Sequence, residues 1–119
     1  MMRLGLSSDA APGAGAAELV DTCVRRGLAA LEVTLGTSAD PLHIFEVCRA
    51  DNVTLCGLLS GGREDVRELA ALSLRTATPI IVGGDGSLDE RIGTARAIIA
   101  TGGSARVVLG GNAHEWLRD

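Results

Sequence analysis

Residues 80–90, IIVGGDGSLDE, contain the pattern that decides the fold of this chain. The apolar run at residues 80–82 is typical of a strand, and the two glycines after it are typical of a tight turn. Ser87 and Glu90 then form a capping box, in which each side chain can satisfy a free amide at the start of a helix. A strand, a glycine turn and a capped helix together make one βα unit.

The same unit recurs along the chain. Three strand ends share a sequence pattern, mostly apolar residues followed by two glycines, which is a weak internal repeat: LLSGG at 58–62, IIVGG at 80–84 and VVLGG at 107–111. The pattern predicts strands at Arg3–Ser7, Ala30–Leu35, Val53–Leu59, Ile80–Val82 and Arg106–Leu109. It predicts helices at 16–26, at 40–50 behind the Asp40-Pro41 start, around 66–73, from Ser87 to the Gly102-Gly103 pair, and at 113–118.

Composition limits what these units can do. The 119 residues fit a single α/β domain, 1–119, and 46% of them are apolar against 22% charged. The net charge of −4 argues against nucleic acid or an anionic membrane as a partner. The start of the chain lacks the features of a signal peptide, and no apolar run approaches the ~20 residues of a membrane span, so a cytoplasmic location is expected.

Two residue types exclude further classes of chemistry. All the basic residues are arginines, which excludes lysine Schiff bases and a P-loop lysine. Cys23, Cys48 and Cys56 are odd in number and form no C-x-x-C pair, so neither a disulfide framework nor a zinc ribbon is expected. We interpret these cysteines as small buried residues.

Two architectures compete for five βα units. A flavodoxin-like doubly wound parallel sheet has helices on both faces, and its central strands are continuously apolar. A partial (β/α)8 TIM barrel has one face toward its helices and one toward a lumen that accepts polar residues. Residues 30–35 alternate, with Leu31 and Val33 opposed to Glu32 and Thr34, and this favours the partial barrel. Glu32 would then face the lumen, in an ion pair with Arg3 or Arg106.

Four stretches resemble one family of barrels. These are RLGLSS at 3–8, VRRGL at 24–28, ALEV at 30–33 and PIIVGG at 79–84. Their sequences resemble those of the xylose-isomerase-like TIM barrels, the sugar phosphate isomerase/epimerase group, over the first five of the family's eight units. The resemblance implies a metal-assisted proton or hydride shift on a small phosphorylated or polyhydroxylated substrate, with a divalent metal as cofactor. The family often has Glu where this chain has Gly110, and no complete catalytic set can be read here.

The carboxyl ends of the strands are where barrels place their chemistry. Glycine pairs there precede helix N-termini, whose free amides favour anions, and Arg63 could add a positive charge. The alternative is that the glycines only permit tight turns. The expected substrate or phosphate-binding residues are Ser60, Gly61, Gly62, Arg63, Gly83, Gly84, Gly110 and Gly111. The same rim would also gather Ser7, Ser8, Asp9, Thr37, Asp85 and Asn112.

Three further residues at this rim could bind a metal. His43 and His114 each lie in the first turn of an expected helix, where the dipole favours neutral imidazole, and Asp85 follows the fourth strand. The alternative is that both histidines are exposed and without function. The sequence therefore predicts an isomerase/epimerase-like domain, with a non-catalytic α/β binding or assembly module as the other interpretation. Five strands leave sheet edges open, so a homo-oligomer that completes the barrel is expected.

Overall fold

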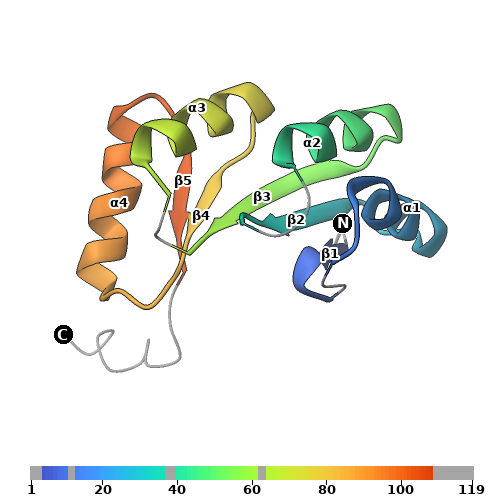
Figure 1. Ribbon diagram of the computed structural model, residues 1–119, viewed down its shortest axis with the longest axis horizontal. Helices are drawn as coiled ribbons and strands as arrows, with labels where there is room; N and C mark the ends of the chain where they lie inside the picture. Colours follow the sequence, from blue (N-terminus) through green and yellow to red (C-terminus); the bar gives the residue numbers. More distant parts are fainter. Residues whose placement is uncertain (1–3, 11–12, 37–39, 62–63, 109–119) are drawn as a thin grey trace.

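Strands and helices alternate along the computed structural model, which describes residues 4–10, 13–36, 40–61 and 64–108 (Figure 1). The strands are β1 (Gly5–Ser7), β2 (Ala30–Thr34), β3 (Thr54–Ser60), β4 (Ile80–Val82) and β5 (Ala105–Val107). The helices are α1 (Ala16–Arg26), α2 (Pro41–Ala50), α3 (Val66–Thr76) and α4 (Leu88–Ala100), with a 3-10 turn, η1 (Ser8–Ala10), after β1. The predicted succession of βα units is confirmed.

The expected boundaries differ from these by a residue at several strands. β1 begins after Leu4, β2 ends one residue early, and β3 is displaced by one residue toward the C-terminus. β5 begins one residue early and ends before Val108. Arg3, Leu109 and the expected helix at 113–118 lie outside the described residues. In the part of the chain that the structure describes, no helix has the length and apolar character needed to span a bilayer.

The five strands form one parallel sheet in the order β1-β2-β3-β4-β5, which is also their order in the sequence. Each helix connects two strands that are neighbours in this sheet. Consecutive helices contact one another from α1 through α4, and they lie along the same side of the sheet in Figure 1. The chain is therefore an α/β protein with its helices beside its sheet in chain order.

The two faces of the sheet differ in burial, as the strand alternation predicts. Side chains that face the helices are almost fully buried; those on the strands include Leu31, Val33, Leu55, Leu58, Ile80 and Val82. They pack against apolar residues of the helices, among them Leu19, Val20, Ile44, Leu69 and Ile98. Side chains on the other face of the sheet, which we call the open face, are half-buried or exposed. They include Ser7, Glu32, Thr34, Leu59, Ile81 and Arg106.

A bulge in β3 interrupts this alternation. Leu31 pairs with Leu55, but the next residue, Glu32, pairs with Gly57, so Cys56 is the extra residue. The Cys56 thiol donates a hydrogen bond to the carbonyl of Leu31, 3.3 Å away. The bulge turns Leu58 toward the helices, on the same face as Leu55, although three positions separate them.

One expectation about burial is wrong. Cys56 was expected to be buried, and the bulge instead leaves it exposed on the open face, whereas Cys23 and Cys48 are buried.

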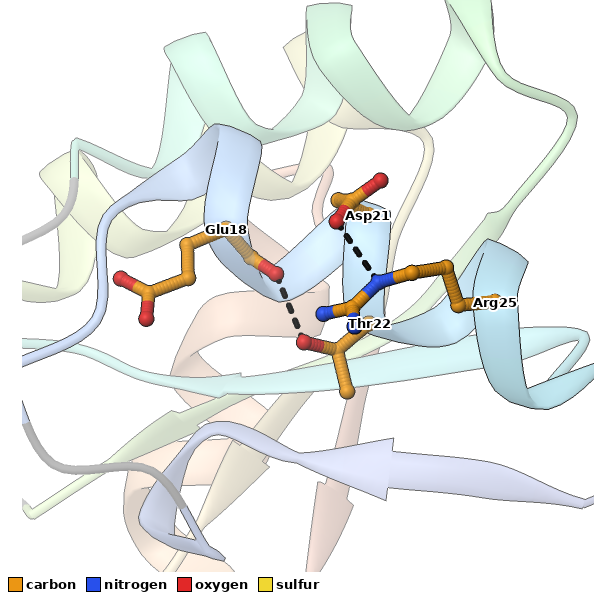
Figure 2. Close-up of polar contacts among 4 residues, drawn as sticks. All are labelled: Glu18, Asp21, Thr22 and Arg25. Carbon is orange, nitrogen blue, oxygen red and sulfur yellow. Dashed lines mark hydrogen bonds and ion pairs between the residues drawn. The ribbon is translucent and has the colours of Figure 1, made fainter.

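The outward face of α1 carries ordinary helix-surface contacts (Figure 2). Arg25 Nε lies 2.8 Å from Asp21 Oδ2 one turn earlier, and the Thr22 hydroxyl donates to the carbonyl of Glu18. Both members of the ion pair are more than half exposed, so it contributes about 0.3–0.5 kcal/mol to helix stability. This charged face is therefore a solvated helix surface and not a site.

Side chains that cap the helices fix the turns after the strands. Asp40 accepts from the Leu42 amide at α2, and Ser87 accepts from the Glu90 amide at α4, as predicted. Asp65 caps α3 in the same way, by accepting from the Arg67 amide at 2.7 Å, and this cap was not predicted. Each cap satisfies a free amide where the chain leaves the carboxyl edge of the sheet.

Candidate functional site

A cleft of about 500 Å³ opens at the carboxyl ends of β2, β3 and β4. This edge of a parallel α/β sheet is where ligands usually bind. The described residues that line the cleft come from the ends of three strands and the loops after them. They are Thr34, Leu35, Gly36, Gly61, Glu64, Gly84 and Asp85.

Residues of η1 form hydrogen bonds with Thr34, at the β2 end of the cleft. The Ser8 hydroxyl accepts a hydrogen bond from the Thr34 amide at 2.9 Å. The Thr34 hydroxyl in turn donates to Asp9 Oδ1 at 2.8 Å. These two bonds join residues that are 25 or 26 positions apart, and they fix the Asp9 carboxylate beside the end of β2. The structure thus places Ser8 and Asp9 at the predicted rim.

A second carboxylate of the cleft follows the middle of its three strands, β3. The Ser60 hydroxyl, at the end of β3, donates to Glu64 Oε2 over 2.6 Å. Ser60 is fully buried, so its hydroxyl is fixed in place and this hydrogen bond orients the Glu64 carboxylate. Ser60 was expected to bind substrate or phosphate directly, whereas Glu64, which was not predicted, is the half-buried member of this pair that lines the cleft.

The glycine pairs lie at the same rim. Gly61 and Gly84 line the cleft, and Gly83 lines an adjoining hollow of about 120 Å³ beside α4. Gly84 has a φ of 99°, and a Cβ there would collide with the backbone of Gly61. The close approach of these two loops therefore accounts for Gly84 without any ligand. The other predicted residues, Gly62, Arg63, Gly110 and Gly111, lie outside the described residues, as do Thr37 and Asn112.

Of the described residues that line the cleft and the hollow, Arg91 is the cationic one. Its Nη1 donates to the carbonyl of Val108 at 2.7 Å, which ties α4 to the end of β5. The guanidinium lies in the hollow beside Glu90 and Thr94, away from the acids of the cleft. Nothing in the sequence marked Arg91, because its partner is a backbone atom 17 positions away.

The charge of the cleft follows from these placements. Glu64 and Asp85 line it and Asp9 lies at its edge, with no basic side chain among the described lining residues. Carboxylates accept hydrogen bonds strongly and attract cations, while they repel phosphate. The cleft suits a ligand that presents hydroxyl groups.

The expected metal ligands are only partly at this site. Asp85 lines the cleft, whereas His43 is exposed in the first turn of α2 and lines neither the cleft nor the hollow. His114 lies outside the described residues. Across the described residues, no three His, Cys, Asp or Glu side chains gather so that they could hold a metal ion. Asp85 is therefore the expected metal ligand that the structure places in the cleft.

The expected ion pair between Glu32 and Arg106 is not formed. Glu32 lies on β2 and Arg106 on β5, so β3 and β4 separate them. Neighbouring strands are about 4.8 Å apart, which puts the two backbones about 14 Å apart. Arg3, the other expected partner of Glu32, lies outside the described residues.

The thiols are not activated for nucleophilic chemistry. Burial raises the pKa of Cys48 to about 11 and also raises the pKa of Cys23. The pKa of Cys56 is raised by partial burial and by the Glu32 carboxylate. A raised pKa keeps a thiol protonated at neutral pH and therefore slow to react.

This burial pattern predicts which cysteine an alkylating reagent modifies. We expect the native monomer to react slowly and at Cys56 alone, and to expose Cys23 and Cys48 only when it unfolds. Peptide mass spectrometry after timed alkylation measures this. Cys56→Ser should leave no thiol that reacts in the native state, and labelling of Cys48 at the rate of Cys56 would contradict the placement.

Comparison of the chain with protein-family models, with curated proteins and with solved structures finds no match.

Proposed function

We propose that this chain has the arrangement of the first five units of a (β/α)8-type barrel, and that its carboxyl-end cleft binds a small polyhydroxylated substrate, as an isomerase/epimerase-like domain would. The observation that carries the proposal is the cleft between β2 and β4, with the carboxylates of Glu64 and Asp85 in its lining. The alternative is an α/β module that binds such a molecule without chemistry.

The barrel arrangement is supported by the order of the strands. A flavodoxin-like sheet has the order 2-1-3-4-5, with helices on both faces. Here the order is sequential, and successive helices contact one another beside the same side of the sheet. The open face carries Glu32 and Arg106, which suits a lumen better than a helix interface.

The choice of substrate is supported by the charge of the cleft. Carboxylates bind sugar hydroxyls as acceptors, and each hydrogen bond to a charged group contributes about 1.5–3 kcal/mol. A carboxylate beside a carbon next to a carbonyl is also the usual general base for isomerisation or epimerisation. Glu64, held by Ser60, and Asp85 are the residues to which we assign these roles. A phosphorylated substrate would place its phosphate by Arg91 in the adjoining hollow.

Amide chemical-shift titration with a panel of aldoses, ketoses, polyols and sugar phosphates tests the proposal. We expect sugars to shift the amides around Thr34, Gly61 and Gly84. Asp85→Asn and Glu64→Gln should each weaken binding about 10- to 100-fold, because each removes a charged acceptor. The matched controls Asp89→Asn and Glu68→Gln, on exposed faces of α4 and α3, should leave the affinity unchanged.

Deuterium uptake from D₂O at the carbon next to the carbonyl separates the two functions. Uptake that Glu64→Gln or Asp85→Asn abolishes supports an isomerase/epimerase-like role. Binding without uptake favours the non-catalytic module. If the panel shifts no cleft amide, or if the control variants weaken binding equally, the cleft is not the site.

A further inference from the structure

The open face of the sheet has its charges at opposite ends. Glu32 lies on β2, next to the edge strand β1, and Arg106 lies on the other edge strand, β5. Ser7 of β1 pairs with Glu32 and shares its face. Among the described residues of the strands, Glu32 and Arg106 are the ionic side chains of the open face, and neither forms an ion pair with another described residue.

We propose that the open face and both sheet edges are covered by a second copy of this chain, in a two-fold dimer that closes a ten-stranded barrel. The inference rests on the barrel arrangement proposed above. A two-fold axis along the barrel axis places β1 of one copy beside β5 of the other at both junctions. All strands then remain parallel, and no described edge is left unpaired.

The dimer also pairs the separated charges. Within one chain three strand spacings, about 14 Å, lie between Glu32 and Arg106, and Arg106 is level with Thr34, two residues beyond Glu32. Across a junction only β1 lies between Glu32 of one copy and Arg106 of the other, which is two spacings or about 10 Å. Long arginine and glutamate side chains can span this separation over the small side chain of Ser7. Symmetry forms the pair twice, since each copy supplies one acid and one base.

Charge complementarity of this kind favours a second copy over an unrelated partner. A partner without a matching acid and base would leave Glu32 and Arg106 desolvated and unpaired, which is unfavourable. The apolar residues between them, Leu59 and Ile81, are already half-buried and would lie inside the closed barrel. A ten-stranded barrel has room for these side chains, because barrel diameter grows with the number of strands.

Charge reversal in the full chain tests the dimer by sedimentation velocity. The unchanged chain should sediment as a dimer, and Glu32→Arg and Arg106→Glu should each weaken dimerisation about 100-fold or more, since each variant meets two like-charge contacts. An equimolar mixture of the two variants should restore the dimer, because every contact in the mixed dimer is again acid to base. The exposed helix variants Glu46→Arg and Arg96→Glu should dimerise like the unchanged chain.

Circular dichroism confirms that each variant is folded, and the mixing experiment keeps the test valid if one variant is less stable. A monomeric unchanged chain would overturn the inference, as would a mixture no tighter than its components. Neither result involves the cleft, so ligand binding can succeed or fail independently.

Discussion

Leu58→Ala is expected to lower the free energy of unfolding by about 3–5 kcal/mol. Leu58 lies on the central strand β3, is fully buried and pairs in register with Val33 on one side and Ile80 on the other. Removing its side chain leaves a cavity between the sheet and the helices, and that cavity cannot collapse without moving both neighbouring strands. Urea unfolding followed by circular dichroism, at one fixed chain concentration, measures the change.

Leu74→Ala is the matched control. Leu74 lies on α3, but its side chain is 62% exposed, and alanine is the better helix former. The same chemical change should alter the free energy of unfolding by no more than about 0.5 kcal/mol. Equal effects at the two positions would mean that the helices do not cover the face of the sheet that carries Leu58.

The fold could be predicted where a signal is local. The helix from Ala16 to Arg26 follows from the spacing of Leu19 and Cys23, and Ser87 starts the last described helix through its own side chain. The alternation of Leu31, Glu32 and Val33 correctly separated a helix-facing side of the sheet from an open one. Each of these patterns depends on a few neighbouring residues, so contacts between distant parts of the chain did not change the structure that the pattern predicts.

The bulge in β3 could not be predicted, because it depends on the neighbouring strands. Period-two alternation from Leu55 would have turned Leu58 to the open face. The structure instead inserts Cys56 and places Gly57 against the side chain of Ile81, where an added Cβ would meet the end of that side chain. This contact depends on the position of Ile81 on the next strand, and the sequence around Gly57 does not reveal it.

The candidate site shows the same division. Asp85, Gly61 and Gly84 were found because they follow strands, and topology alone brings strand ends to one rim. Glu64 and Arg91 were missed, since each acquires its place through a contact that no motif marks. The acids among the described lining residues support the hydroxyl-bearing substrate proposed above, while the expected anion-binding residues Gly62, Arg63, Gly110 and Gly111 lie outside the described residues. Local sequence located the rim, and contacts across the fold determined its charge.

Gly84→Ala is expected to destabilise the chain by about 2–4 kcal/mol and to deform the cleft. Its φ of 99° is unfavourable for any residue with a Cβ. The added methyl group would also collide with the backbone of Gly61, which cannot rotate away as a side chain can. The β3–α3 and β4–α4 loops must therefore separate, so sugar affinity should fall together with stability.

Gly93→Ala is the matched control, and it should raise the free energy of unfolding, which Gly84→Ala lowers. Gly93 lies inside α4 with open space where its Cβ would be, and it is exposed. Alanine there should stabilise the chain by about 0.5–1 kcal/mol, because it favours the helix and restricts the unfolded chain. Urea unfolding of both variants, with amide shifts around Asp85 as the local readout, compares them. If Gly84→Ala changed neither stability nor affinity, the two loops would not be in contact. The cleft that Glu64 and Asp85 line would then not have the shape described above.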